Sequence, residues 1–400
     1  MPQYVGSEPP PPIPLSGIGR SRVHGHFGNL PMARVQFLWS PQFSQYNLGP
    51  FHPLKPERLE LTYSLIFAYG LLARPGVGVA QPAPATEAEV LAVHAPEYVA
   101  AVRALDEGGP PDPSAYGLGT GDNPIFPGIY QASLLYSGAS LQAAQAVYRG
   151  EAEAAFNISG GLHHAHRARA AGFCVFNDPA IAIAWLLRES GGDAKVVYLD
   201  IDAHHGDGVQ EAFYNDPRVL TISLHESGRT LFPGSGFVEE LGTGEGKGFA
   251  VNLPLAPFTG DEVYLWAFEE IVPPLVAAFR PDFFVSQLGA DGHYLDPLTH
   301  LHLSTAAYES IFARIRELAG KRCIALGGGG YSLDAVPRVW TLAFAAMVDV
   351  KLADELPGRG GHLRDQATPE LSAAEIKSTR DFAARAVEQI KRQIFPYHRL

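Results

Sequence analysis

The chain has little cysteine and no long hydrophobic run. Its 400 residues include two cysteines, Cys174 and Cys323, which are too few for a disulfide framework. No stretch of about 18 or more apolar residues occurs, so we expect no membrane span. The proline-rich N-terminus lacks a basic segment followed by an apolar one, so we also expect no signal peptide. Free thiols fit a reducing compartment, and we expect a cytoplasmic protein.

Positive charge is also scarce. The chain carries 30 Lys+Arg against 42 Asp+Glu, which gives a formal net charge of −12, and it has no Lys/Arg-rich run. Nucleic-acid binders present basic patches, so we expect no nucleic-acid partner. An acidic protein can instead steer cationic ligands. Hydrophobic residues make up 46% of the chain and charged residues 18%, a composition that excludes wholesale disorder.

The first residues differ in composition from the rest. Residues 1–33 are rich in proline and glycine, which resist helix and sheet, so we predict a disordered tail there. Met32 is a candidate native start near the end of this tail. Residues 34–400 show no clear linker and no internal repeat, and we predict that they form one domain.

Beyond the tail, helical and strand patterns alternate. Apolar runs with β-branched residues predict buried parallel strands between helices. This alternation favours an α/β fold, in which ligands bind at the carboxyl ends of the strands. The expected strands are 33–39, 195–201, 219–224, 283–288 and 322–326. The expected helices are 57–72, 88–93, 96–105, 129–148, 179–188, 208–214, 261–279, 306–318 and 334–348.

Carboxylates and histidines follow two of these strands. Asp200, Asp202 and His204 alternate at the end of the strand 195–201, so they project to one side of an extended segment. Asp291 comes soon after another predicted strand and is expected at the same edge of the sheet. Taken alone, Asp291 fits a capping residue before a loop. Beside the first cluster it becomes a candidate metal ligand.

Two further groups extend this cluster. His163 and His164 follow a Gly-Gly turn, and five of the 15 histidines fall within residues 163–205. This clustering favours catalysis over chance surface histidines. Tyr331 follows four glycines that match no phosphate-binding motif, so we expect them to let the backbone approach a ligand and to present the tyrosine. A packed aromatic that closes the loop is the alternative for Tyr331.

These groups together permit metal-assisted amide hydrolysis. One histidine and two carboxylates leave coordination positions open for water and substrate, as in catalytic zinc sites. A divalent metal polarises a carbonyl and lowers the pKa of bound water, while a nearby histidine takes and returns the proton. A tyrosine hydroxyl can hold the developing oxyanion. Oxygen-rich ligation also suits Fe²⁺ or Mn²⁺.

Five ordered segments resemble the motifs of the histone deacetylase superfamily. The resemblance runs from about residue 35 to about residue 350 and points to the acetoin-utilisation branch of bacterial, class I-like, metal-dependent deacetylases. It implies the arginase–deacetylase fold, a single α/β domain whose central, mostly parallel sheet has about eight strands with helices on both faces. The segments are SGGLHHAHRARAAGFCVFND, YLDIDAHHGDGVQEAF, TISLH, QLGADGHYLDPL and LGGGGYSL.

The resemblance also implies roles for individual residues. It implies Zn²⁺ at the metal position, with Fe²⁺ as the alternative, and metal-bound water as the nucleophile. Asp200 is expected to hold His163, which acts mainly through its charge. Asp207 is expected to hold His164, the general base and then acid. Tyr331 is expected to polarise the carbonyl. The implied metal ligands are Asp202, His204 and Asp291.

The same resemblance places the substrate and a second ion. Phe173 and Phe232 are expected to flank an acyl-lysine tunnel beside Gly172, with Leu298 at its mouth, although both phenylalanines also fit an ordinary core. Asp122 matches a rim residue that grips substrate amides, and it fits a turn equally well. The implied ligands of a structural K⁺ are oxygens of Asp200, Asp202, His204, Ser223 and Leu224.

Arg58 and Cys174 match positions near the pocket of the family. Arg58 corresponds to an arginine of an inner acetate channel, and it also fits a helix surface. Cys174 lies beside the pocket in the family, and packing is its simplest role.

The expected activity is hydrolysis of N-ε-acetyl-lysine in proteins, which releases acetate and free lysine. Acetylated proteins are the expected partners, and the branch is thought to act on metabolic proteins such as acetyl-CoA synthetase. The first alternative is hydrolysis of acetylpolyamines or other small cationic amides. The second is a non-catalytic ligand sensor, which needs no oxyanion donor and therefore does not explain Tyr331. The sequence leaves the oligomeric state open.

Overall fold

The structure is a computed structural model that describes residues 33–358 and 360–400. Most of the predicted tail, including the candidate start at Met32, lies outside the described residues. Its last residue, Ala33, instead begins strand β1 (Ala33–Leu38) and pairs with Ala152 of the neighbouring strand. The described residues fall within one compact unit.

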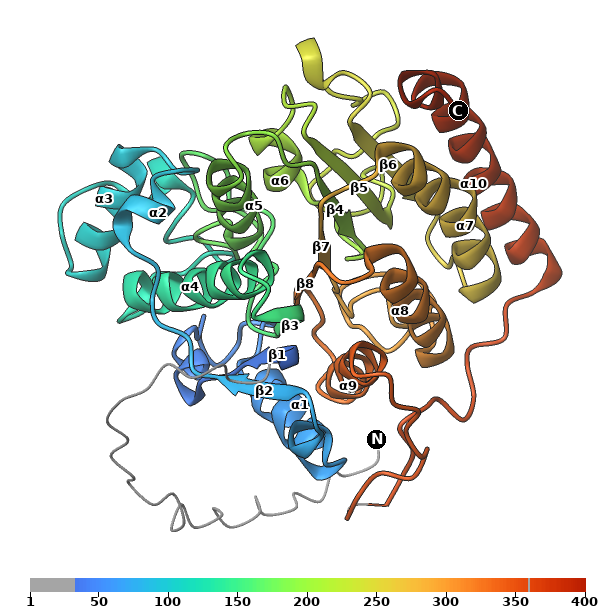
Figure 1. Ribbon diagram of the computed structural model, residues 1–400, viewed down its shortest axis with the longest axis horizontal. Coiled ribbons are helices and arrows are strands. Elements are labelled where there is room, and N and C mark those ends of the chain that lie inside the picture. Colours follow the sequence, from blue (N-terminus) through green and yellow to red (C-terminus); the bar gives the residue numbers. More distant parts are fainter. Residues whose placement is uncertain (1–32, 359) are drawn as a thin grey trace. The chain divides into compact units, whose positions relative to one another are not determined.

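A parallel sheet forms the centre of the described chain (Figure 1). Its eight strands lie in the order β2-β1-β3-β8-β7-β4-β5-β6, and the neighbouring strands are paired in parallel. The predicted α/β fold with a central parallel sheet is confirmed. After β1, the strands are β2 (Val77–Ala80), β3 (Ala152–Asn157), β4 (Val196–Asp200), β5 (Val219–Glu226), β6 (Ala250–Leu255), β7 (Phe283–Gln287) and β8 (Cys323–Leu326).

Sequence patterns predict five of these strands and miss β2, β3 and β6. The predicted strands β4, β5 and β7 are apolar and buried along their whole length. By contrast, β3 is rich in alanine, which is depleted in strands. Edge strand β6 contains Pro254, which an edge tolerates because one side of the strand lacks ladder hydrogen bonds. The other edge strand, β2, has four residues and includes Gly78.

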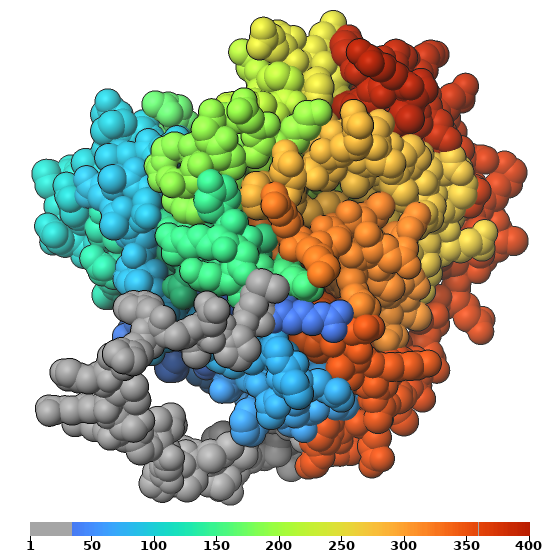
Figure 2. Space-filling view, in the orientation of Figure 1, coloured from blue at the N-terminus to red at the C-terminus, as the bar shows by residue number. Residues whose placement is uncertain are grey.

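Helices cover both faces of the sheet (Figure 1). One layer holds α4 (Ile129–Tyr148) and α5 (Asp178–Glu189), which pack on each other and on β3 and β7. The other layer contains α1, α9, α8 and α7 in contact, and α10 packs on α7 and β6. Figure 2 shows the same face in space-filling form, with α10 (red) beside the segment that carries α7. The bounds of the second group are α1 (Glu57–Ala68), α7 (Asp261–Phe279), α8 (Thr305–Ala319), α9 (Ala335–Met347) and α10 (Ala373–Gln393).

The predicted helices occur with ends that differ by about one turn or less. The shorter ones are α2 (Glu87–Val90), α3 (Pro96–Asp106) and α6 (Asp207–Ala212). The sequence does not predict α10, which begins at a capping box formed by Ser372 and Glu375. Within residues 33–358 and 360–400, no helix combines the length and the apolar character needed to cross a membrane.

The central strands bring distant segments of the chain to one edge of the sheet. Strands β3, β8, β7 and β4 are neighbours in this order, and in a parallel sheet their carboxyl ends share one edge. The loops that follow them therefore meet there. These loops carry the two adjacent histidines after β3, Tyr331 after β8, Asp291 after β7, and Asp202 and His204 after β4.

Candidate active site

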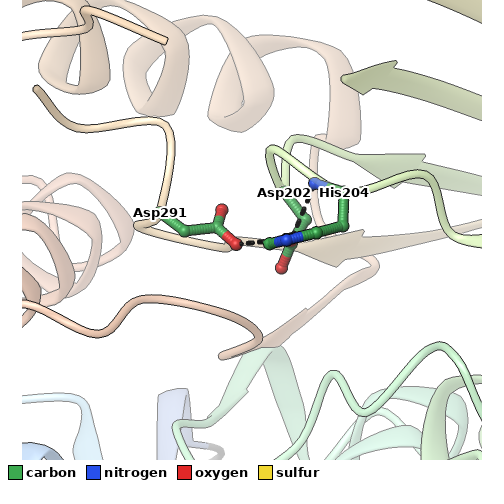
Figure 3. A group of neighbouring side chains, drawn as sticks. All are labelled: Asp202, His204 and Asp291. Carbon is green, nitrogen blue, oxygen red and sulfur yellow. Dashed lines mark hydrogen bonds and ion pairs between the residues drawn. The ribbon is translucent and has the colours of Figure 1, made fainter. Parts of the chain in front are cut away.

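Two carboxylates and one imidazole converge at this edge of the sheet (Figure 3). The His204 Nδ1 atom lies 3.1 Å from Asp202 Oδ1 and 2.9 Å from Asp291 Oδ2. One ligand atom of each residue lies within 4.8 Å of the others, and all three side chains are buried. Burial disfavours a charged imidazole, yet hydrogen bonds to the two carboxylates raise the pKa of His204 to about 10.

This arrangement fits a divalent cation. Burial and the charge of Asp202 raise the pKa of Asp291 well above its usual value, because two ionised carboxylates repel each other in a buried site. Buried charges persist when they are paired or bind a metal. The outer oxygens are already held, since Gln287 Nε2 and Gly329 N donate to Asp202 Oδ2 at 2.6 and 2.7 Å, and Ala203 N donates to Asp291 Oδ1 at 2.7 Å. The inner oxygens remain directed toward the imidazole and suit a shared cation.

The glycine run 327–330 brings backbone close to these carboxylates. A Cβ atom on Gly329 would lie 2.3 Å from Asp291 Oδ2, so no other residue fits there without movement. Arg58, on α1, donates from Nη1 to the carbonyls of Gly328 at 2.7 Å and Gly330 at 3.1 Å. The side chain of Arg58 is buried. The helix-surface alternative for Arg58 is therefore wrong, and this arginine supports the glycine run.

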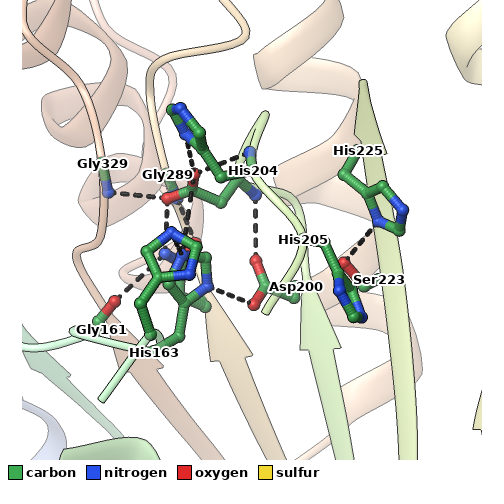
Figure 4. A network of polar contacts seen from close by, with 12 residues as sticks. Gly161, His163, Asp200, His204, His205, Ser223, His225, Gly289 and Gly329 are labelled. Carbon is green, nitrogen blue, oxygen red and sulfur yellow. Dashed lines mark hydrogen bonds and ion pairs between the residues drawn. The ribbon is translucent and has the colours of Figure 1, made fainter. Parts of the chain in front are cut away.

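The adjacent histidines lie beside the triad, and each is backed by a carboxylate; Figure 4 shows His163 beside Asp200. His163 Nδ1 lies 2.7 Å from Asp200 Oδ2, and His164 Nδ1 lies 2.7 Å from Asp207 Oδ1. The two Nε2 atoms face each other at 3.0 Å. The ring of His164 meets the ring of His204 edge-on, with centroids 5.9 Å apart. The histidine pair and the triad therefore form one cluster.

Different surroundings give the two imidazoles different charges. Burial opposes a charge on His163, but Asp200 and Asp202 raise its pKa to about 9. Burial and the charge of His163 lower the pKa of His164 to about 4, against the opposite effect of Asp207. At neutral pH, His163 is therefore charged and His164 is neutral. A neutral imidazole whose Nδ1–H is fixed by a carboxylate is suited to accept a proton at Nε2.

Aromatic side chains surround this cluster. Phe232 meets the His164 ring edge-on, with centroids 5.0 Å apart. Phe173 meets Tyr331 in the same way at 5.7 Å, and Tyr331 lies 6.4 Å from the His204 ring. Burial and the nearby carboxylates raise the pKa of Tyr331 well above its usual value. Its hydroxyl therefore keeps its proton and can donate a hydrogen bond.

The family model of the histone deacetylase domain matches residues 52–347. The chain belongs to the histone deacetylase family. It is thus a hydrolase of a metal-dependent deacetylase family, and the matched range contains the triad, both histidines and Tyr331. The resemblance seen in the sequence is confirmed.

Individual relatives agree with this assignment. This chain is 42% identical over 328 residues to the acetoin utilization protein AcuC of Bacillus subtilis (strain 168). The match covers 80% of this chain and 84% of the relative. It is 37% identical over 332 residues to histone deacetylase B of Dictyostelium discoideum, and this match covers 82% of this chain and 77% of that protein.

Similarity to solved structures confirms the arginase–deacetylase fold of this chain. A crystal structure of an HDAC homolog complexed with SAHA superposes with a TM-score of 0.79 at 31% identity, covering 88% of this chain and 100% of that one. An HDAC homolog from Aquifex aeolicus gives a TM-score of 0.78 at 30% identity with the same coverage.

Some of the residues expected to bind substrate line a common cleft, and others do not. Asp122, Gly172 and Phe232 line one cleft of about 670 Å³. A Cβ atom on Gly172 would lie 2.3 Å from His164 Cδ2, so the glycine leaves room for the imidazole. Phe173 and Leu298 lie outside the lining of this cleft. Phe173 borders the site through Tyr331, whereas the backbone N–H of Leu298 donates to Asp296 Oδ1 at 2.9 Å.

Two of the residues expected to hold K⁺, Asp200 and Ser223, lie on the adjacent strands β4 and β5 (Figure 4). Asp200 and Ser223 are register partners in these strands, and Leu224 follows Ser223 in the buried part of β5. Asp200 Oδ1 accepts the Asp202 N–H at 3.1 Å. Ser223 Oγ lies 2.8 Å from His225 Nδ1. Strand pairing thus places the side-chain oxygens of Asp200 and Ser223 on adjacent strands, and Asp202 and His204 follow β4.

Cys174 is buried beside the same cluster. Its thiol donates to the carbonyl of Gly172 at 3.2 Å, and burial raises its pKa well above the usual value. These contacts fit the expected packing role and an unreactive thiol.

Two buried aspartates that the sequence analysis passes over hold the loops of the site. Asp178 accepts the N–H groups of Gly161 at 2.9 Å and Leu162 at 2.8 Å, in the turn before the paired histidines. Asp296 accepts the N–H of Tyr331 at 2.8 Å. In the sequence, Asp178 resembles a helix-start residue and Asp296 a turn residue before proline. Their partners are distant in the chain, so local patterns do not reveal these contacts.

Proposed function

We propose that residues 34–400 form a domain that hydrolyses the acetyl amide of N-ε-acetyl-lysine in proteins, with Zn²⁺ as the metal and Fe²⁺ as the alternative. The observation that carries this proposal is the buried triad of Asp202, His204 and Asp291 beside the facing imidazoles of His163 and His164. The triad would hold the metal through two carboxylates and one imidazole. When bound, the metal would polarise the amide carbonyl and lower the pKa of water.

The chain's own residues would then handle the proton and the developing charge. His164, neutral and oriented by Asp207, would take a proton from the attacking water at Nε2 and deliver it to the leaving lysine amine. His163, whose charge Asp200 favours, would offset negative charge in the transition state. Tyr331, which keeps its proton, would donate a hydrogen bond to the carbonyl oxygen as it becomes an oxyanion.

Exposed apolar side chains near the site favour a polypeptide substrate over a small amine. Phe51 is 99% exposed and precedes His52, whose ring packs 4.3 Å from Phe173. The carbonyl of Asp122, near Ile125 in the sequence, accepts from His52 Nε2 at 3.2 Å. Exposed apolar groups beside a site favour contact with a polypeptide, and acetylpolyamines offer no side chains to meet them. Besides Phe51, the exposed apolar side chains are Phe232, which lines the cleft, and Ile125, Leu295 and Leu333, which are near Asp122, Asp296 and Tyr331 in the sequence.

A comparison of two substrates tests this proposal. With metal-loaded protein, an acetyl-lysine peptide with apolar flanking residues should give a higher kcat/KM than acetylspermidine. Faster turnover of acetylspermidine would show that the small-amide alternative is right. Failure of both Zn²⁺- and Fe²⁺-loaded protein to hydrolyse either substrate at any pH would instead support the sensor alternative.

A matched pair of variants tests the apolar surface. Phe51→Ser should raise KM for the peptide and leave turnover of a small fluorogenic acetyl-lysine substrate unchanged. Phe67→Ser is the control, because Phe67 is also an exposed phenylalanine but lies on α1. Equal effects of the two substitutions on the peptide would remove the argument for a protein substrate.

We also propose that the cluster between β4 and β5 binds a structural K⁺. Support comes from the hard oxygen atoms of Asp200 and Ser223 on paired strands, together with main-chain oxygens of Asp202, His204 and Leu224. Replacing K⁺ by tetramethylammonium at constant ionic strength should lower the melting temperature of the wild-type protein. Ser223→Ala should reduce this dependence, and an unchanged K⁺ dependence would contradict the assignment of Ser223.

A further inference from the structure

A second cavity, of about 60 Å³, lies between the sheet and helices α8 and α9. Arg34, Glu153 and Gly320 line its outer part, near the first residues of β1 and β3 and just before β8. They lie at the amino-terminal edge of the parallel sheet, whereas the candidate active site lies at the carboxyl edge. The cavity is therefore separate from that site.

Small side chains on neighbouring elements create the cavity. Cys323 and Ala325 face the same side of β8, and their register partners Ala154 in β3 and Ser286 in β7 face that side too. Ala343 of α9 lines the cavity as well. Protein interiors are normally packed without such gaps, and one water needs about 10–15 Å³ of this kind of volume. The space is therefore large enough for several connected atoms of a ligand.

Ser286 gives this cavity a polar group that needs a partner. Its side chain is fully buried, and its Oγ atom lies beside the Cys323 thiol, a weak partner, but has no nitrogen or oxygen partner among the described residues. Buried hydroxyls in proteins are nearly always hydrogen-bonded. A hydroxyl that lines a cavity and has only a thiol beside it is therefore able to pair with an oxygen of a ligand. The wall is otherwise largely apolar and includes Val35, Leu288, Phe312, Ile315 and Met347.

Cationic side chains surround the mouth of the cavity. Arg34 and Arg316 line it, and 53% of the Arg34 side chain is exposed. Glu153 lies 3.8 Å from Arg34 and 3.0 Å from Lys321, while Arg316 pairs with Asp349 at 2.6 Å. Three cations and two carboxylates leave one net positive charge at the mouth. This excess favours an anionic group on the ligand.

We propose that the cavity binds a short-chain carboxylate that carries a keto or hydroxyl oxygen. The carbon chain lies among the small side chains under α8 and α9, and the carboxylate stays at Arg34 and Arg316. The keto or hydroxyl oxygen pairs with Ser286 Oγ. This site does not depend on the deacetylase activity proposed above, and its test measures binding alone.

Three probes of similar size separate the contributions to binding. The full-length, metal-loaded protein is titrated by calorimetry with 4-oxopentanoate, pentanoate and 2-pentanone, and 4-oxopentanoate should bind most tightly. Ser286→Ala should lower the affinity for 4-oxopentanoate to that for pentanoate, a loss of about threefold to tenfold for one hydrogen bond. The double variant Arg34→Gln, Arg316→Gln should bind 4-oxopentanoate with the affinity that the wild-type protein has for 2-pentanone. Equal affinities of the three probes for the wild-type protein would overturn the proposal.

A cavity-filling variant provides the control. Ala343→Leu should abolish binding of all three probes, and Ala325→Val is the second filling variant if the first does not fold. Neither substitution touches the triad, so a carboxylate bound at the catalytic metal would still bind to both variants. Binding that survives in a folded, filled variant would therefore overturn the proposal, as would the absence of binding to the wild-type protein.

Discussion

Two adjacent histidines acquire different properties because their neighbours differ. His163 has Asp200 at Nδ1, and its Nε2 lies 3.9 Å from Asp202 Oδ1. His164 has one carboxylate, Asp207, and the charge of His163 opposes its protonation. Pairs of titratable groups whose pKa values are pushed apart divide acid, base and electrostatic work between them. Residue type alone would not distinguish the two imidazoles.

Tyr331→Phe tests the role of a single hydroxyl. Loss of one oxyanion donor should lower kcat by about 10²–10³-fold, while the metal content stays unchanged. His164→Ala should be at least as harmful. Tyr294→Phe is the control, because the Tyr294 hydroxyl donates to the Ala367 carbonyl at 3.1 Å, away from the triad. A wild-type rate for Tyr331→Phe would refute the assigned role.

His166 should make the stability of the folded protein depend on pH. Despite burial and the nearby Arg169, contacts of 3.4 Å with Asp207 Oδ2 and 2.5 Å with Glu211 Oε2 raise the pKa of His166 to about 9. This pKa exceeds the unfolded value of about 6.5, so the stabilisation is complete below about pH 6.5 and is lost as the pH rises through 9. His166→Gln should therefore lower the melting temperature more at pH 6 than at pH 9.5. Calorimetry showing the same loss at both pH values would contradict this origin.

At the scale of elements, a strand or helix is predictable when its own residues carry the pattern. The β-branched runs of β4, β5 and β7 are visible in the sequence, and the candidate metal ligands can be found because they follow such strands. Strand β3, by contrast, has a sequence, AEAAFN, that becomes a strand only between β1 and β8. Asp178 and Asp296 escape prediction for the same reason, since their backbone partners come from other elements.

Arg58 links helix α1 to the glycine run, and this link can be measured. Arg58→Met keeps most of the side-chain stem but leaves the buried carbonyls of Gly328 and Gly330 without their donor. We expect a loss of about 1–3 kcal/mol in the free energy of unfolding and a lower kcat. Arg74→Met, at an exposed arginine, is the control for urea unfolding. Equal stabilities of the two variants would show that the carbonyls find other partners.

At the scale of the whole molecule, the acidic composition is not simply a surface property. Asp200, Asp202, Asp207 and Asp291 are part of the net charge of −12, yet all four lie within the site cluster. Each of these carboxylates has a histidine partner that offsets its charge locally, so the four contribute little to long-range steering. The proposed metal-binding role of Asp202 and Asp291 instead predicts that the stability of the whole domain depends on a cation.

Metal removal should reveal this dependence. Metal at about 1,000 times its Kd stabilises the folded protein by about 4 kcal/mol, so a chelator should lower the melting temperature of the wild type. Asp291→Asn should remove that response. It also relieves the repulsion with Asp202, so the metal-free variant should melt no lower than the metal-free wild type. A chelator effect of wild-type size in Asp291→Asn would exclude Asp291 as a ligand.

Strand β8 determines when this protein can become active during its synthesis. It is the last of the eight described strands along the chain, yet it lies between β3 and β7 and joins the half-sheet β2-β1-β3 to the half-sheet β7-β4-β5-β6. Until Cys323–Leu326 has left the ribosome, these two halves share no strand pairing, and Tyr331 emerges later still. A nascent or prematurely terminated chain therefore carries two open sheet edges, which are sites of aggregation, and an incomplete centre. The candidate active site therefore cannot be complete before most of the chain has been made.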